Sequence, residues 1–199
     1  MILYGDSKSG NCYKLQLVCS NLGQAYTWRE MDITQGDTRT PEFLALNPQG
    51  KIPLLQREDG SILTESNAII NYLAKDSELV PKDPWLFAQV LRWQFFEQYY
   101  HEPNIAVARY IKLYLDSPQD RQQELKQKQQ QSYHALDVME QHLADKTFLV
   151  NEQYTVADIS LYAYTHVAYE GGVDIKNYPA IKAWLSRVEQ QPNYCPLCY

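Results

Sequence analysis

Four cysteines are the residues of this sequence most able to do redox or metal chemistry: Cys12, Cys19, Cys195 and Cys198. Cys195 and Cys198 have the Cys-x-x-Cys spacing, which is typical of thiol–disulfide exchange or of half a zinc site. A redox pair normally opens a helix after a strand, whereas this pair lies close to Tyr199 at the carboxyl end. A zinc ion would need a second pair of ligands nearby, and the sequence has none. We therefore expect this pair to be an inert tail.

Glu97 and His101 offer one further candidate for metal chemistry. They are four residues apart on an expected helix, which places both side chains on one face. The other histidines, His134, His142 and His166, are scattered and supply no second half-site. A packed or ion-paired surface therefore explains the pair better, and we predict no metal site.

The pair Ile52-Pro53 indicates a place where the backbone itself could bind a ligand. Asn47-Pro48-Gln49-Gly50 is a cluster of turn residues, and an apolar strand follows it. Proline cannot donate to a sheet, so it stands at the first residue or the edge of a strand. An Ile-Pro bond here is a candidate cis peptide, which would leave the N–H and C=O of Ile52 for a ligand.

The elements that position these residues follow from hydrophobic spacing in the first 76 residues. A helix is expected from Asn11 or Cys12 to just before Gly23, because apolar residues recur there with helical spacing. The Asp59-Gly60 pair predicts a hairpin. The expected order is β-α-β-α-β-β-α, with strands at 2–4, 25–31, 52–55 and 61–63, a short helix at 41–46, and a helix beginning near Ser66.

After a polar connector with two prolines, the spacing of apolar residues predicts only helices. Residues 86–115 form an aromatic-rich stretch that Pro103 should kink or break. Residues 118–144 are rich in glutamine but keep one apolar face. Thr155 and Asp158 form a capping box, to which we assign a structural role. We predict an α/β domain over 1–76, a linker over 77–84 and an all-helical domain over 85–199.

Composition limits the partners of the chain. Its 199 residues carry 18 Lys and Arg against 24 Asp and Glu, a net charge of −6. This balance argues against binding to nucleic acid or to an acidic membrane surface. No uncharged apolar run approaches the ~18 residues of a membrane span, and the start lacks the pattern of a signal peptide. We therefore expect a cytoplasmic protein that binds neither nucleic acid nor membrane.

The sequence resembles the cytosolic glutathione transferases, in particular bacterial, serine-type members. Four segments carry the resemblance, in the order and separation typical of the family: Ser9 to Lys14, Asn47 to Pro53, Glu65-Ser66, and Thr155 to Asp158. The likeness extends along essentially the whole chain. It implies a thioredoxin-like N-terminal domain, an all-helical C-terminal domain and a homodimer.

The resemblance implies that glutathione is the co-substrate, without a metal, and that its thiolate attacks a small hydrophobic electrophile. A hydroxyl donor at a helix start suits a thiolate, because both the donor and the helix dipole favour an anion. Ser9 matches the catalytic serine, and Asn11 adds an amide donor. Tyr4 and Cys12 are the rival sulfur contacts, as in the tyrosine-type and cysteine-type members.

The remaining site residues follow by matching positions. The backbone of Ile52, before Pro53, would pair with the cysteinyl backbone of glutathione, and Lys51 would lie near its glycyl carboxylate. Glu65 would accept from the γ-glutamyl ammonium, and Ser66 would hold the γ-glutamyl carboxylate through its hydroxyl and N–H. The residues expected to face the electrophile are Trp93, Tyr100 and His101.

Other functions remain open within the same resemblance. Glutathione-dependent reduction of disulfides or peroxides, or isomerisation of a small acid, would use the same thiolate site. A protein-interaction module without catalysis is the alternative from a different class. Such modules usually lose the glutathione-site residues, and here Ser9, Ile52-Pro53 and Glu65-Ser66 are all present.

Overall fold

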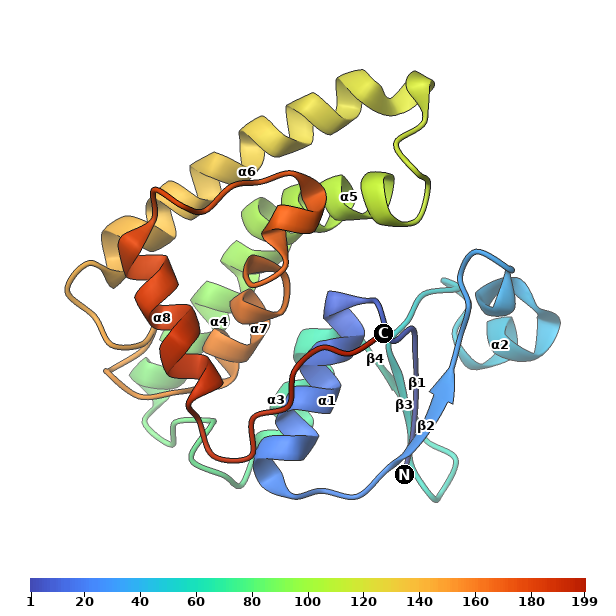
Figure 1. Ribbon diagram of the computed structural model, residues 1–199. Coiled ribbons are helices and arrows are strands. Elements are labelled where there is room, and N and C mark those ends of the chain that lie inside the picture. Colours follow the sequence, from blue (N-terminus) through green and yellow to red (C-terminus); the bar gives the residue numbers. More distant parts are fainter. The chain divides into compact units, whose positions relative to one another are not determined.

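The computed structural model describes residues 1–199, which form two compact units (Figure 1). The first unit comprises Met1–Glu78 together with Gln191–Tyr199, and the second comprises Leu79–Gln190. The division after Glu78 falls inside the connector that the sequence predicts at 77–84. The carboxyl end differs from the sequence-based boundaries, because the residues after Gln190 pack with the first unit.

The first unit is built on a four-stranded mixed sheet with the order β2-β1-β3-β4. Its strands are β1 (Ile2–Gly5), β2 (Thr27–Glu30), β3 (Leu54–Gln56) and β4 (Ile62–Thr64). Strand β1 runs parallel to β2 and antiparallel to β3, and β3 is antiparallel to β4. The predicted thioredoxin-like order is confirmed, with helices α1 (Gly10–Leu22), α2 (Pro41–Leu46) and α3 (Ser66–Ala74).

Local sequence explains where these elements begin and end. Helix α1 ends at Gly23, whose φ of 62° is left-handed and therefore suits glycine. Helix α2 begins at Pro41 after Thr40, whose side chain accepts from the N–H of Phe43. Strand β3 begins one residue after Pro53, because proline has no N–H to give to the sheet.

The carboxyl-terminal segment Gln191–Tyr199 runs beside helix α1 (Figure 1). Hydrogen bonds join the two. The Tyr13 hydroxyl donates to the carbonyl of Cys195 at 2.6 Å. The Ser20 hydroxyl donates to the carbonyl of Asn193 at 2.7 Å, and the Asn21 amide donates to that of Pro192 at 2.9 Å. This segment is therefore a strap that completes the first unit.

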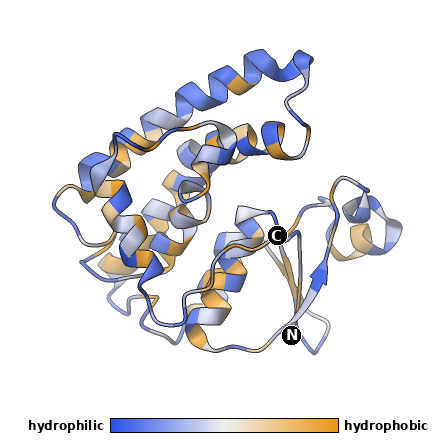
Figure 2. Ribbon diagram, viewed as in Figure 1, coloured by the Kyte–Doolittle hydropathy of each residue, from blue (hydrophilic) through white to orange (hydrophobic).

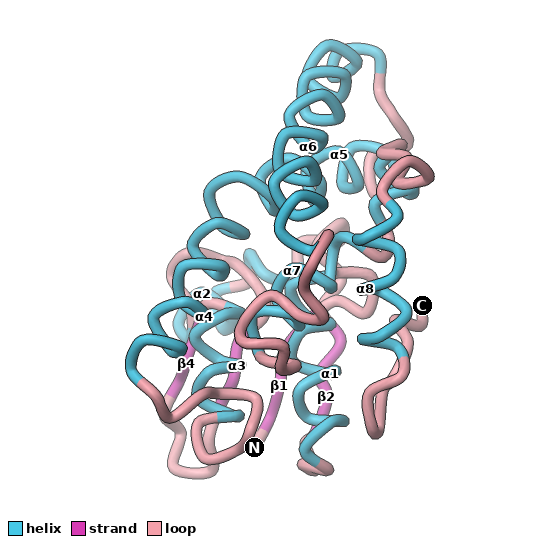
Figure 3. The backbone as a smooth tube through the Cα atoms, turned by 90° about the vertical axis from the view of Figure 1, so that its left-hand side faces the viewer, coloured by secondary structure: helices cyan, strands magenta, loops and turns pink.

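The second unit consists of helices and loops, whereas all the strands belong to the first unit (Figure 3). Its helices are α4 (Pro84–Phe96), α5 (Glu102–Leu113), α6 (Gln122–Leu143), α7 (Val156–Thr165) and α8 (Pro179–Glu189). Every residue of α7 is buried, so it is the central helix of this unit. The glutamine-rich start of α6 is hydrophilic but helical (Figure 2). No helix of the chain combines the length and the apolar character that crossing a membrane requires.

The predicted break at Pro103 takes the form of a wide helical turn between α4 and α5. Residues Glu97–His101 form a π-helix, in which the N–H of Glu102 donates to the carbonyl of Glu97. Such a turn accommodates a proline ring near the start of the following helix without a clash against the preceding turn. Glu97 and His101 are both fully buried, so of the packed or ion-paired arrangement expected for them the structure shows the packed one.

Candidate functional site

The sheet register brings the predicted site segments to one end of the first unit. Tyr4, near the end of β1, lies opposite Leu54, at the start of β3. Leu54 also lies opposite Thr64, at the end of β4. The loop after β1, the segment before β3 and the start of α3 therefore meet at the same end of the sheet. They carry Ser9, Ile52-Pro53 and Glu65-Ser66, respectively.

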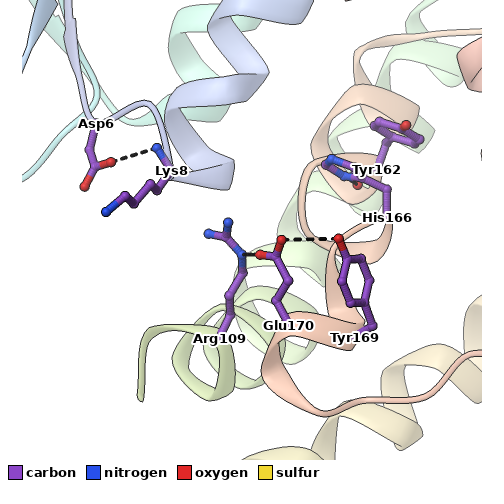
Figure 4. A network of polar contacts seen from close by, with 7 residues as sticks. All are labelled: Asp6, Lys8, Arg109, Tyr162, His166, Tyr169 and Glu170. Atoms are coloured by element: carbon purple, nitrogen blue, oxygen red, sulfur yellow. Dashed lines mark hydrogen bonds and ion pairs between the residues drawn. The ribbon is translucent and has the colours of Figure 1, made fainter. Parts of the chain in front are cut away.

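Ser9 is the N-cap of α1, and its loop is fixed by hydrogen bonds on both sides. Its N–H donates to the carbonyl of Asp6 at 3.0 Å, while the Asp6 carboxylate accepts from the N–H of Lys8 at 2.7 Å (Figure 4). The Ser9 hydroxyl oxygen accepts from the N–H of Cys12 at 3.4 Å. An oxygen that accepts here still carries a proton that it can donate, so Ser9 suits an anion at the helix start.

The two rivals of Ser9 are placed differently. The Tyr4 hydroxyl donates to Oε1 of Gln56 at 2.8 Å, and its ring packs against Phe43 inside the core. Cys12 is fully buried, and this burial raises the pKa of its thiol to about 12. The thiol of Cys12 is therefore held protonated at neutral pH, which is the opposite of what a reactive thiolate needs.

Asn11 and the buried Lys14 are both joined by hydrogen bonds to the start of α3. The Ser66 hydroxyl donates to Oδ1 of Asn11 at 3.1 Å. The ammonium of Lys14 donates to the Ser66 oxygen and to Oδ1 of Asn67, each at 3.2 Å. Lys14 is fully buried and Ser66 is 6% exposed. Sequence reasoning missed Lys14, although a lysine with Leu17 and Val18 at helical spacing was a signal that it lies on the inner face.

Glu65 stands between β4 and α3 with φ at 68° and ψ at 111°. A positive φ is unfavourable for a residue with a side chain. The side chain of Glu65 is exposed, and its carbonyl accepts from the N–H of Ile69. The conformation thus presents a carboxylate beside the first turn of a helix.

The segment before β3 is shaped by Asn47, which sequence reasoning treated only as a turn residue. Its amide donates to the carbonyl of Lys51 at 2.8 Å, and its own carbonyl accepts from Gly50. Lys51 is exposed and Pro53 is buried. The Ile52-Pro53 bond is cis, which confirms the prediction. The structure records no backbone partner for the N–H or C=O of Ile52.

The three residues expected to face the electrophile lie in different surroundings. Trp93 is 1% exposed and donates to the carbonyl of Leu149 at 3.1 Å, in the core of the helical unit. His101 is fully buried, with Nε2 at 2.8 Å from the hydroxyl of Thr165. Only Tyr100 is exposed. It lines a groove of about 570 Å³ in the helical unit, together with Phe96, Tyr99, Pro103, Asn104, Lys128, Gln131, His134, Ala135 and Val138.

The helical unit also buries ionisable groups whose partners are structural. Arg109, 2% exposed, pairs with Glu170, whose other oxygen accepts from the Tyr169 hydroxyl (Figure 4). Thr155 and Asp158 form the predicted capping box at the start of α7. No group of three or more histidine, cysteine, aspartate or glutamate side chains is arranged to hold a metal ion.

Similarity to known proteins identifies the family. The sequence matches the model of the glutathione S-transferase N-terminal domain over residues 3–81 and that of the C-terminal domain over 101–192. A crystal structure of a glutathione S-transferase from Pseudomonas fluorescens Pf-5 is 54% identical, with a TM-score of 0.97 over 100% of this chain and 98% of that chain. The glutathione S-transferase-like protein LUC7 of a Fusarium species is 31% identical over 93% of this chain and 86% of its own length. The chain belongs to the glutathione S-transferase family.

Proteins similar to this chain carry different functional names. The disulfide-bond oxidoreductase YfcG of Escherichia coli K12 is 26% identical over 92% of this chain and 87% of its own length. Elongation factor 1-gamma of Danio rerio is 33% identical, but the match covers 81% of this chain and only 37% of that protein. The glutathione transferase URE2P6 of Phanerochaete chrysosporium, crystallised with oxidised glutathione, is 26% identical, with a TM-score of 0.86 over 96% of this chain and 91% of that chain.

Proposed function

We propose that this protein is a serine-type glutathione transferase, in which Ser9 stabilises the glutathione thiolate for attack on a small hydrophobic electrophile. One observation carries the assignment. The Ser9 hydroxyl accepts from the N–H of Cys12 at the start of α1, so its proton can be given to a sulfur anion. Tyr4 already donates to Gln56, and the thiol of Cys12 stays protonated. Asn11 adds an amide donor on the same turn.

The same end of the sheet supplies groups for the rest of glutathione. The backbone of Ile52, held before the buried Pro53, pairs with the cysteinyl backbone, and exposed Lys51 attracts the glycyl carboxylate. Glu65 accepts from the γ-glutamyl ammonium. The Ser66 hydroxyl already donates to Asn11, so we assign the γ-glutamyl carboxylate to the N–H of Ser66, in the first turn of α3.

Three wider features belong to the same proposal. The exposed ring of Tyr100 is the group we retain for contact with the electrophile, because Trp93 and His101 lie in the core. A cytoplasmic location is supported by the four cysteines, none of which forms a disulfide. Removal of electrophiles in the cytoplasm would serve detoxification. Tyr99 and Val138, exposed on the same groove, support a homodimer in which a second copy packs beside Tyr100.

Replacement of Ser9 tests the assignment. Ser9→Ala should raise the pKa of the bound glutathione thiol and lower kcat with an aryl halide by about 100-fold, as expected for a lost oxyanion donor. The thiolate is followed by its ultraviolet absorbance, and glutathione binding by calorimetry should persist. Ser7→Ala, in the same loop, is the matched control. Wild-type turnover together with wild-type thiolate absorbance in Ser9→Ala would refute the role of Ser9.

Disulfide reduction is the second candidate, and the name of the Escherichia coli relative favours it. The same Ser9 and Asn11 would then hold a thiolate that attacks a disulfide sulfur. Assays of a mixed disulfide and of an aryl halide, run on one preparation, separate the two activities by their relative kcat/KM. If the wild-type protein neither binds a glutathione resin nor is stabilised by glutathione against heat, a non-catalytic interaction module replaces both.

A further inference from the structure

Two of the four cysteines differ from the others in exposure. Cys12 and Cys19 are fully buried in α1, and burial raises the pKa of each thiol to about 12. Cys195 is half-buried and Cys198 is exposed, and both lie on the strap Gln191–Tyr199. A buried thiol that stays protonated is unreactive, so the thiol chemistry open to this chain is that of the strap.

The strap holds Cys195 against α1. The Cys195 carbonyl accepts from the Tyr13 hydroxyl at 2.6 Å, and the turn before it is fixed by the bond from the Ser20 hydroxyl to the carbonyl of Asn193 at 2.7 Å. Burial raises the pKa of the Cys195 thiol, and a hydrogen bond with the Ser20 side chain lowers it in part. Cys195 is therefore fixed in place as a thiol at neutral pH, which the expectation of an inert tail did not foresee.

The residues after Cys195 can bring the second thiol back to it. The structure records no hydrogen bond to Pro196, Leu197 or Cys198, which lie outside helices, strands and turns. A disulfide needs Cα atoms about 4.4–6.8 Å apart. A turn with Pro196 in its second position brings the first and fourth Cα atoms within about 7 Å, and proline favours that position. Closing such a turn breaks no hydrogen bond of these three residues.

We propose that Cys195 and Cys198 form a redox site that reacts reversibly with small disulfides. The exposed thiolate of Cys198 attacks one sulfur of the small disulfide, forms a mixed disulfide and expels a thiolate. The thiolate of Cys195 then attacks the Cys198 sulfur, which forms the Cys195–Cys198 disulfide and expels the second thiolate. The two protons lost by the cysteines pass to the two expelled thiolates. Two thiols of the chain are thus oxidised, and one small disulfide is reduced to two thiols.

The order of the two attacks follows from exposure and tethering. An incoming disulfide reaches Cys198 at the surface, whereas Cys195 is half-buried beside α1. The second attack is intramolecular, so a high effective concentration offsets the small thiolate fraction of Cys195. Exposed disulfides are readily reduced again, and cytosolic disulfides are usually transient ones of this kind. Neither step uses Ser9, so the inference goes beyond the proposed function and does not depend on it.

Reaction of the whole chain with hydroxyethyl disulfide tests the site, because this probe lacks the charged groups of glutathione. The wild type should lose two thiols and keep no adduct by intact mass, and cleavage after Arg187 should release one peptide with a Cys195–Cys198 bond. Cys195→Ser should retain one hydroxyethyl-thiol adduct on Cys198. Cys198→Ser should react at least about tenfold more slowly. Cys19→Ala, which removes a buried thiol, is the matched control and should react as the wild type does.

The two steps can fail separately. A wild-type chain that keeps a stable adduct would show that Cys195 does not complete the reaction. A Cys198→Ser variant that is oxidised as fast as the wild type would show that Cys198 is not the first thiol to attack. Either result would overturn the proposal, as would a disulfide that dithiothreitol does not reduce.

Alkylation by iodoacetamide measures the shielding of Cys195 without any disulfide. In the folded chain Cys198 should be modified at least about tenfold faster than Cys195, and in urea the two rates should become similar. Equal rates in the folded chain would mean that α1 does not shield Cys195, which also overturns the proposed order. None of these measurements requires glutathione, so they stand even if the protein does not bind glutathione and the proposed function falls.

Discussion

Glu65 occupies a backbone conformation that glycine adopts far more easily than glutamate. Its φ of 68° lies on the left-handed side, where a Cβ atom costs about 1–2 kcal/mol. No hydrogen bond from its side chain caps α3, so the structure gives no compensation through the helix itself. Strain of this kind often marks a functional position. The proposed contact with the γ-glutamyl ammonium would account for this strained conformation.

Glu65→Ala and Glu65→Gly should separate the carboxylate from the strain. Both lose the carboxylate, so both should bind glutathione at least about tenfold more weakly, the loss expected for a charged hydrogen bond. Glu65→Gly should nevertheless be about 1 kcal/mol more stable than Glu65→Ala, because glycine tolerates a positive φ. Calorimetric titration and urea unfolding give the two quantities. Equal glutathione affinity in all three proteins would contradict the role of Glu65.

Buried titratable groups in the helical unit make its stability depend on pH in opposite senses. Burial lowers the pKa of the His166 imidazole to about 4, below its ordinary 6.5. Between pH 6.5 and pH 4, His166 takes up a proton in the unfolded chain but not in the folded protein. Its contribution to the stability of the fold is therefore present above pH 6.5 and lost as pH falls toward 4. Burial raises the pKa of the Asp158 carboxyl from 3.8 to about 6. Its stabilisation is present below pH 3.8 and lost as pH rises through 6.

His166→Phe should remove the part of this pH dependence that comes from His166. Phenylalanine keeps the stacking on Tyr162, whose ring lies 4.5 Å from that of His166, but removes the titrating group. As pH falls from about 7 to about 4, the free energy of unfolding of the variant should rise by about 3 kcal/mol relative to that of the wild type. Urea unfolding across this range measures it, and His134→Gln controls for loss of an exposed histidine. A constant difference between His166→Phe and wild type would mean that His166 is not held neutral.

The sequence was enough to predict the structural role of some residues but not of others. The cis bond before Pro53 follows from local chemistry, so the sequence was enough to predict it. The placement of Lys14 depends on contact with Ser66 and Asn67, which are more than fifty residues away. Sequence periodicity marked Trp93 as part of a helix face, but it could not tell a core ring from one at a pocket.

Among the elements, the attachment of the strap Gln191–Tyr199 to α1 is what the sequence did not predict. The helices around it have periodic apolar faces, and the sequence predicts them to within a few residues. The strap has no such period, because it is held by hydrogen bonds from α1 to its carbonyl groups. Its attachment therefore became visible only when α1 was placed beside it.

Tyr13→Phe should loosen this strap without disturbing the rest of α1. The ring of Tyr13 is buried, so phenylalanine keeps its packing, but the Cys195 carbonyl loses its donor. The expected cost is about 1 kcal/mol, seen as lower thermal stability and faster removal of terminal residues by carboxypeptidase. Tyr72→Phe, on the exposed side of α3, is the matched control. Equal digestion of both variants and the wild type would show that this hydrogen bond does not hold the strap.

At the scale of the whole molecule, the net charge of −6 has to be reconciled with an anionic ligand. Long-range attraction cannot bring glutathione to this protein, because the overall field opposes its carboxylates. The donors that we propose, at the helix starts of Ser9 and Ser66 and on Lys51, would therefore act locally. Local donors of this kind are what the first unit places at one end of its sheet.

The exposed groove of the helical unit is the feature that one chain by itself does not explain. Tyr99 and Val138 line it and are 73% and 47% exposed. If a second copy covers this surface, Val138→Asp should raise the dimer dissociation constant by at least about tenfold, because it buries an unpaired carboxylate.

Gln127→Asp adds the same charge at an exposed polar position of α6 and should leave the dimer intact. Sedimentation equilibrium of wild type and both variants at matched concentrations distinguishes these effects. A wild-type protein that sediments as a monomer, or a Val138→Asp variant as dimeric as the wild type, would exclude this surface as the interface. The groove would then be a free aromatic surface of the helical unit, open to the small apolar molecules that its rings suit.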